Sequence, residues 1–228
     1  MRSQTPVIAR MRSAWFYTNS RVLAGLLLLG MHTLARGDSV DPRLGAPFEK
    51  RERPSMGSNQ APIVVVEFGS YKCGHCQEFQ EQVFPKIKEL YVDSGKVQWV
   101  LVPSSDNAAD QSSRIFAIGR CVHRQGKFWE TLDFLMNISN RPSSFLEDLV
   151  AKNSAIDAGD LAFCLQDRET SRQVAKDFDE YQLLKVKGTP TFFIRRLRAD
   201  GSRTEATVRG LQTAEYFQRV FDELLKSP

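Results

Sequence analysis

The chain has 228 residues, of which 42% are hydrophobic and 25% are charged. This is the composition of an ordinary globular protein and excludes a disordered or fibrous chain, and the length suits one domain that carries an insertion. The net charge of +4 comes from 31 basic and 27 acidic residues. Because four of the arginines lie in the first 35 residues, the basic excess is no evidence for a nucleic-acid or membrane partner.

The N-terminal 60 residues have the pattern of a targeting signal followed by a leader. Residues 1–35 carry no acid, and the apolar run Val22–Met31 precedes the small-residue site at 33–35. An uncleaved membrane anchor is the alternative, although the run is shorter than the roughly 20 residues that span a bilayer. We expect export to the periplasm or another extracytoplasmic space, where disulfides persist. Residues 36–60, rich in proline, glycine and charges, predict an extended leader with at most one short strand.

Residues 61–103 predict a β-α-β unit. The apolar run at 63–68 indicates a buried strand, and the stripe of apolar residues at 77–91 indicates a helix that Pro85 should bend. A second buried strand is expected at 97–102. Two strands joined in this way pair in parallel with a right-handed crossover.

Residues 104–184 predict an all-α insertion, and residues 185–228 return to a β-β-α pattern. In the insertion, Ser144 and Glu147 have the spacing of a capping box. The expected insertion helices are 112–124, 127–136, 144–152, 158–165 and 169–184, followed by strands 191–195 and 205–209 and a helix at 213–225. The fold class is therefore α/β, with a central mixed sheet flanked by helices and an all-α insertion between its two halves.

Cys73 and Cys76 are separated by Gly-His at the point where the first strand is followed by a helix, which predicts a dithiol/disulfide centre. A thiol attacks only as thiolate, and free backbone N–H groups at a helix start favour the anion at Cys73. A protonated His75 and the neighbouring Lys72 would add positive potential and bring the pKa to about 6. Stabilising the reduced, ionised form makes the disulfide a stronger oxidant. Cys76, one turn into the helix, is expected to be the second sulfur.

A structural zinc site is the competing interpretation. It would need a second pair of ligands, but Cys121 and Cys164 are single and 43 residues apart, and His123 beside Cys121 has poor ligand geometry on a helix. A purely structural disulfide across Gly-His is the other alternative, although such tight loops are usually reactive. We therefore expect no metal, and no cofactor other than the Cys73–Cys76 disulfide.

A second motif, residues 188–191 with the sequence Gly-Thr-Pro-Thr, immediately precedes a strand. Pro190 could be an ordinary edge or turn residue. It could also be a cis-proline, which would turn the Thr189 backbone toward an extended substrate for strand-like hydrogen bonds beside the sulfurs.

A strand, C-x-x-C, a helix and a late G-T-P-T together resemble the thioredoxin superfamily, and the helical insertion resembles its DsbA-like branch of exported thiol oxidoreductases. The resemblance runs from about Pro54 to Leu225. Its further landmarks are Ala61-Pro62, Glu67-Phe68, Tyr71, Phe84-Pro85, Gln125–Glu130 and Phe163–Leu165.

The resemblance implies a thioredoxin fold with Cys73 as the attacking cysteine, Cys76 as its resolving partner and Pro190 as the cis-proline. It also implies that Glu67 is the buried acid that some members keep beneath the active site, where it could accept or relay the Cys76 proton. A solvated carboxylate at the strand end is the alternative for Glu67. Gly-His between the cysteines and Thr189 before the proline resemble isomerase-type relatives instead.

The function expected from these features is the introduction of disulfides into folding exported proteins, with a membrane redox partner that resets the dithiol. The alternatives are a disulfide isomerase or reductase of the same fold, or a redox-silent peptide-binding chaperone. The long N-terminal dimerisation module of bacterial isomerases is missing, so we favour oxidation and a monomer. In the insertion, Cys121 and Cys164 would form a second, non-catalytic disulfide, or else pack as two free buried cysteines.

Overall fold

The computed structural model describes residues 53–105, 112–198 and 200–226, all of which belong to the unit Asp41–Pro228. The signal expected in residues 1–35 lies outside the described residues. Among the described residues, no helix is both long enough and apolar enough to cross a membrane.

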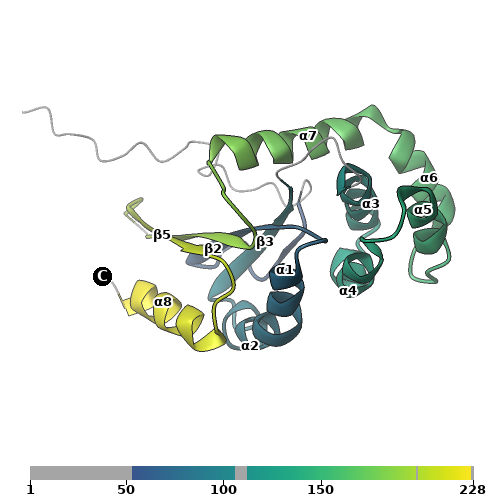
Figure 1. Ribbon diagram of the computed structural model, residues 1–228. Helices are drawn as coiled ribbons and strands as arrows, with labels where there is room; N and C mark the ends of the chain where they lie inside the picture. The colour runs from purple at the N-terminus through teal and green to yellow at the C-terminus, as the bar shows by residue number, and fades with distance from the viewer. Residues whose placement is uncertain (1–52, 106–111, 199, 227–228) are drawn as a thin grey trace, which may run out of the picture. The chain divides into compact units, whose positions relative to one another are not determined.

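The centre of the fold is a five-stranded mixed sheet with the order β1-β3-β2-β4-β5 (Figure 1). Strands β2 and β3 are parallel, and the other neighbouring pairs are antiparallel. The strands are β1 (Ser55–Met56), β2 (Ile63–Gly69), β3 (Val97–Pro103), β4 (Thr191–Leu197) and β5 (Arg203–Arg209). The mixed sheet predicted from the sequence is confirmed, and the one short strand expected in the leader is β1.

Strand β2 is the middle strand and carries Glu67 into the interior. In the register, Glu67 lies opposite Leu101 of β3 and Phe192 of β4. A residue in this position has a hydrogen-bonded strand on each side and helices above and below, so its side chain is shielded from water.

The helical segment that follows the cysteine motif is not a regular α-helix. It consists of α1 (Gly74–Glu78), the π-helical turn η1 (Phe79–Val83), α2 (Phe84–Ile87) and the π-helical turn η2 (Lys88–Val92). The Phe84 N–H donates to the Phe79 carbonyl, five residues back. Pro85 has no N–H to continue the α-helical ladder, and the wide turn before it accommodates that loss. At Pro85 the structure thus shows changed hydrogen-bond spacing, and the bend expected there stays a prediction.

Helices cover both faces of the sheet (Figure 1). On one face, Phe79 packs against Phe192, which in turn packs against Phe217 of α8 (Ala214–Lys226), with ring centroids 4.7 and 4.9 Å apart. On the other face, Phe68 packs edge-on against Tyr181 at 6.2 Å. Burial of these rings fixes the helix start at the cysteine motif relative to the sheet.

The insertion has its own hydrophobic core, centred on residues such as Phe116, Phe128 and Leu135. Its helices are α3 (Ser112–Arg124), α4 (Phe128–Ile138), α5 (Ser143–Ala151), α6 (Ala158–Gln166) and α7 (Arg168–Leu183). All five begin and end within two residues of the predicted bounds. The capping box predicted at Ser144 is wrong, because α5 begins one residue earlier, and the Glu147 carboxylate accepts from Nε of Arg114 at 2.7 Å.

A buried ion cluster joins the chain before β1 to the insertion. Asp177 of α7 accepts from Arg53 at 2.8 Å and from Arg120 of α3 at 2.6 Å, and Glu180 also pairs with Arg53. The Asp177 side chain is only 4% exposed. A carboxylate this deeply buried is stable as an ion only while both arginines remain in place.

Candidate active site

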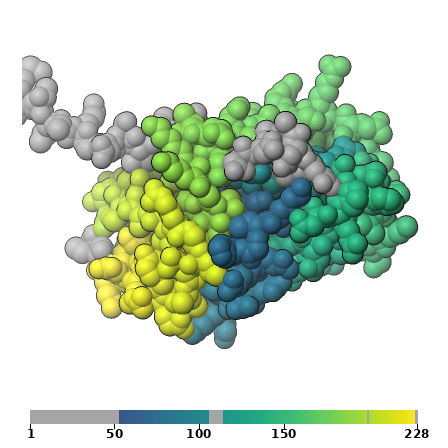
Figure 2. Space-filling view, viewed as in Figure 1, coloured from purple at the N-terminus to yellow at the C-terminus, as the bar shows by residue number. Residues whose placement is uncertain are grey.

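The two cysteines of the motif lie at the start of the helical segment, at the carboxyl end of β2. In Figure 2 the blue surface of this segment lies between the yellow C-terminal helix and the teal insertion. Cys73 is the N-cap of α1, with extended backbone angles, and its side chain is partly exposed. Cys76 is fully buried in the first turn. Both are free thiols in this structure.

The environment of Cys73 favours its thiolate. The pKa of Cys73 is lowered to about 5, first by a hydrogen bond with Cys76 and then by the Thr189 side chain and the backbone N–H groups of Cys76 and His75. Roughly 99% of a thiol with that pKa is ionised at pH 7. His75 is exposed and contributes through its backbone, whereas the sequence had suggested its imidazole.

The environment of Cys76, in contrast, disfavours its thiolate. Its hydrogen bond to Cys73 raises its pKa, and burial raises it further. Only one of two adjacent sulfurs can ionise easily, and the exposed one is stabilised as the anion. The structure thus pairs a partly exposed sulfur that ionises readily, Cys73, with a buried sulfur that does not, Cys76.

The loop before β4 lies directly against Cys73. The Cys73 thiol donates to the Thr189 carbonyl oxygen at 3.2 Å, and the Thr189–Pro190 peptide bond is cis. The loop is fixed from two sides, since the Thr191 hydroxyl donates to the Gly188 carbonyl at 2.7 Å and the Gly210 N–H donates to the Pro190 carbonyl at 2.8 Å. The structure thus brings both sequence motifs together at one place.

Glu67 is buried beneath the cysteines with no exposed surface, so it is not the solvated carboxylate of the alternative interpretation. Burial raises the pKa of Glu67 to about 7, against the opposing effect of hydrogen bonds from Trp99 and Gln80. The Trp99 indole donates at 2.9 Å, and the Gln80 amide lies 3.1 and 3.2 Å from the two carboxylate oxygens. A carboxyl group with this pKa can hold or release a proton near neutral pH.

Gly69 lies between Glu67 and Cys76. A Cβ at this position would be 3.3 Å from Glu67 Oε1 and 3.9 Å from Cys76 Sγ. Both groups therefore border the volume that a Cβ at Gly69 would fill, and a side chain there would crowd the carboxyl group.

Three contacts attach the cysteine motif to the helical insertion. Tyr71 packs against Phe116 with ring centroids 5.3 Å apart, and its carbonyl accepts from the Ser139 hydroxyl at 3.0 Å. The Gln77 amide donates to Asn137 at 3.2 Å. These contacts hold the turn that carries Cys73 between the sheet and the insertion.

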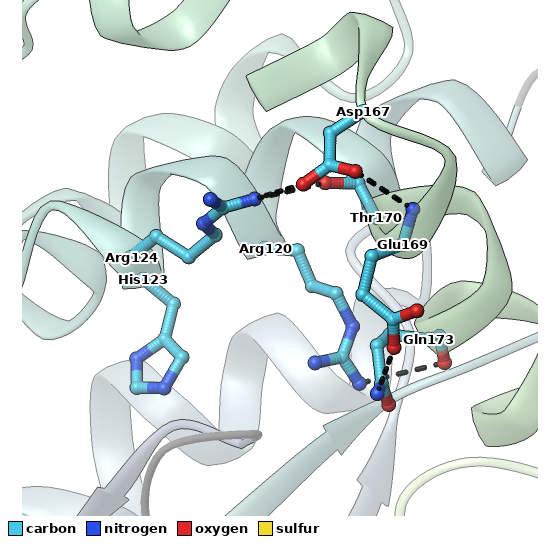
Figure 3. Close-up of a pocket in the computed structure, with 7 residues that line it drawn as sticks. All are labelled: Arg120, His123, Arg124, Asp167, Glu169, Thr170 and Gln173. Atoms are coloured by element: carbon cyan, nitrogen blue, oxygen red, sulfur yellow. Dashed lines mark hydrogen bonds and ion pairs between the residues drawn. The ribbon is translucent and has the colours of Figure 1, made fainter. Parts of the chain in front are cut away.

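The insertion contains a disulfide and a polar pocket. Cys121 and Cys164 are joined by a disulfide bond between α3 and α6. The pocket, of about 290 Å³, lies between α3 and the start of α7 and is lined by Arg120, His123, Arg124, Asp167, Glu169, Thr170 and Gln173 (Figure 3). Across it, Arg124 pairs with Asp167 at 2.9 Å, whereas Arg120 and Glu169 pair with Asp177 and Arg172 outside the lining. None of them belongs to either active-site motif.

Across the described part of the chain, no three acidic, histidine or cysteine side chains cluster as metal ligands.

Comparisons with known proteins assign the chain to a family. The family described as thioredoxin matches residues 49–211. The chain belongs to this thioredoxin family. A Bacillus cereus protein named "Probable disulfide bond formation protein D" is 30% identical over 158 residues, which cover 64% of this chain and 72% of that protein.

Solved structures of DsbA-type proteins share the fold of this thioredoxin-family chain. Wolbachia pipientis alpha-DsbA1 superposes with a TM-score of 0.66 at 24% identity, over 81% of this chain and 96% of that one. Oxidised BdbD from Bacillus subtilis gives 0.63 at 24% identity, over 78% and 95%. With the reactive thiol pair, these findings make the protein a DsbA-like thiol–disulfide oxidoreductase.

Proposed function

We propose that this oxidoreductase introduces disulfides into folding proteins outside the cytoplasm. The observation that carries the proposal is the contrast between the two sulfurs, since the pKa of Cys73 falls to about 5 and that of Cys76 is raised. The interactions that stabilise the Cys73 thiolate are lost when the sulfurs are bridged. They therefore favour the reduced protein, and the bridged form readily oxidises other thiols.

The reaction proceeds by two thiol–disulfide exchanges. A substrate thiolate attacks Cys73 Sγ of the bridged protein, forming a mixed disulfide and releasing the Cys76 sulfur, which takes up a proton. A second substrate thiolate then attacks the substrate sulfur of the mixed disulfide and releases the Cys73 thiolate. The substrate loses two electrons to form its disulfide, and the Cys73–Cys76 pair gains them.

Glu67 is the proton donor and acceptor for Cys76 in this proposal. Its carboxyl group and the Cys76 sulfur both lie within 4 Å of the position that a Gly69 Cβ would take, and its pKa of about 7 suits transfer in both directions. Cys76 leaves as a sulfur with a raised pKa, so a nearby proton lowers the barrier to its release.

The substrate segment next to the reacting cysteine would lie along Thr189 and Pro190. The Thr189 backbone is adjacent to Cys73 Sγ and is partly exposed. An extended peptide can form strand-like hydrogen bonds there without a specific sequence, which suits an enzyme that acts on many unfolded chains.

The cellular setting follows from residues 1–35, whose pattern is that of a secretory signal. Outside the cytoplasm a disulfide donor is reduced at each turnover, so a membrane redox partner would reoxidise Cys73–Cys76. Isomerase activity of the same site is the second candidate, because Gly-His between the cysteines and Thr189 before Pro190 resemble isomerase-type relatives.

The test is oxidation of a reduced, unfolded protein by the bridged form, with substrate thiols counted over time. We expect one substrate disulfide per protein, and no reaction for Cys73→Ser. A matched control is Cys121→Ala/Cys164→Ala, which should keep the reaction. A reduction potential of about −120 to −180 mV agrees with oxidation or isomerisation, whereas a value of about −270 mV, like that of thioredoxin, would show a reductase.

A further inference from the structure

The charges around Cys73 are distributed unevenly. The motif segment 70–77 and the loop 185–191 contain lysines but no acidic residue. Lys72 precedes Cys73, and Lys185 and Lys187 precede the Thr189–Pro190 bond. We call these three residues the lysine rim.

The lysine rim has no charge partners of its own. None of the three lysines forms an ion pair with another residue in the described parts of the chain. Lys185 and Lys187 are exposed, and Lys72 is partly exposed. By contrast, Lys86, Lys88 and Lys127 on other surfaces each pair with a carboxylate. The rim charges are thus available to a bound molecule.

The rim lies within electrostatic reach of a substrate at Cys73. The Thr189 carbonyl is 3.2 Å from Cys73 Sγ, and Lys187 is two residues from Thr189, which is at most about 7 Å of backbone. This is shorter than the Debye length of about 10 Å at 0.1 M salt. Lys185 is four residues away and should act more weakly. Lys72 is the immediate neighbour of Cys73.

The opposite side of the motif has a different character. Gln77 hydrogen-bonds both Asn137 of the insertion and Glu81, so the helix side facing the insertion carries a carboxylate. Two of the three rim lysines, Lys185 and Lys187, belong to the cis-proline loop, where an extended substrate segment would pair.

We propose that the lysine rim selects thiol substrates whose reacting cysteine is flanked by acidic residues. This inference rests on the proposed function, because it names the class of polypeptide that the same site prefers. A charge pair at about 8 Å in water changes binding roughly twofold, so the rim and two flanking carboxylates give a preference of about tenfold at low salt.

The experiment uses three dithiol peptides that differ only in the residues beside the cysteines, which are glutamate, serine or lysine. Each rate with the bridged protein is divided by the rate of the same peptide with a small neutral disulfide, because flanking charges also alter the peptide thiol pKa. At 10 mM salt we expect the normalised rate to be about tenfold higher for the glutamate peptide than for the lysine peptide. At 1 M salt the ratio should fall toward one, since the Debye length is then about 3 Å.

Variants separate the rim from total charge. Lys187→Glu should reduce the ratio more than Lys185→Glu, and the double variant should reverse the preference. The control pair Lys152→Glu/Lys176→Glu makes the same change in net charge on the insertion and should leave the ratio unchanged. A glutamate-to-lysine rate ratio near one in the unaltered protein would overturn the proposal. An equal fall of this ratio in the control pair would overturn it too. Oxidation of the serine peptide tests the proposed function separately, because a protein that oxidises it without charge preference is still an oxidase.

Discussion

Replacing Glu67 by glutamine tests whether the buried carboxyl group is held near its titration point. Its pKa is raised from 4.5 to about 7 by burial. The folded state therefore binds the proton more tightly than the unfolded state does, so the contribution is fully favourable below about pH 4.5 and is lost as the pH rises to 7. At 1.36 kcal/mol per unit of pKa, ionising this group costs the folded protein about 3 kcal/mol above pH 7.

Glu67→Gln removes that cost because the amide does not ionise. The Gln80 amide can rotate to present its oxygen to the new NH₂ group, and the Trp99 indole keeps an acceptor. We expect the difference in unfolding free energy between the variant and the unaltered reduced protein to rise by about 3 kcal/mol from pH 4.5 to pH 8.

The assay is reversible urea unfolding of both proteins at half-unit pH intervals. Because Cys73 titrates in both proteins, the difference between them isolates Glu67. Glu78→Gln, an exposed change in the same helical segment, is the control and should give a flat difference. If the difference in unfolding free energy between Glu67→Gln and the unaltered protein is also independent of pH, the carboxyl group is ionised across this pH range. Its proposed role as a proton carrier for Cys76 is then wrong.

Four further substitutions probe how the active-site turn, the loop before β4 and the insertion are held. The buried Tyr71 hydroxyl has no hydrogen-bond partner among the described residues, so Tyr71→Phe should leave thermal stability unchanged or raise it by about 1 kcal/mol; a clear loss would reveal a partner. Gly119→Ala would place a Cβ 2.0 Å from that hydroxyl and should destabilise strongly, with partial rescue in the Tyr71→Phe background. Lys185 has φ 52°, so Lys185→Gly should stabilise by about 1 kcal/mol in urea unfolding, and no gain would mean that the lysine side chain compensates. Asp177→Asn should cost about 3–5 kcal/mol because two arginines lose their shared charge, and a loss below 1 kcal/mol would show the cluster to be solvated.

The cysteine pair and the order of helices and strands were predictable because both are local in sequence. Cys73 and Cys76 lie at a strand-to-helix junction that apolar periodicity locates, and the five insertion helices have clear apolar stripes. The resemblance to the DsbA-like branch supplied what local pattern could not, namely the expectation that Glu67 is a buried acid.

The partners of Glu67 were not predictable, because they come from different elements. Trp99 is on β3, and Gln80 is on a π-helical turn whose hydrogen-bond spacing shifts its side chain relative to a regular helix. A signal for Gln80 was present, since it is an amide next to Phe79 within an otherwise apolar stripe. The capping box at Ser144 failed because α5 begins at Ser143 with Pro142 as its N-cap, so Ser144 lies inside the first turn.

The position of β2 has a consequence for how the chain folds. Its partner on one side, β3, follows it closely, but Ile63 pairs on the other side with Arg196, beyond the whole insertion. Contacts between residues so distant in sequence form slowly, because the chain must close a long loop first. Until β4 arrives, one edge of this mostly apolar strand is open to pairing with other chains. An insertion that forms its own core early shortens the effective length of that loop, so the helices that support the redox site also protect the nascent sheet from aggregation.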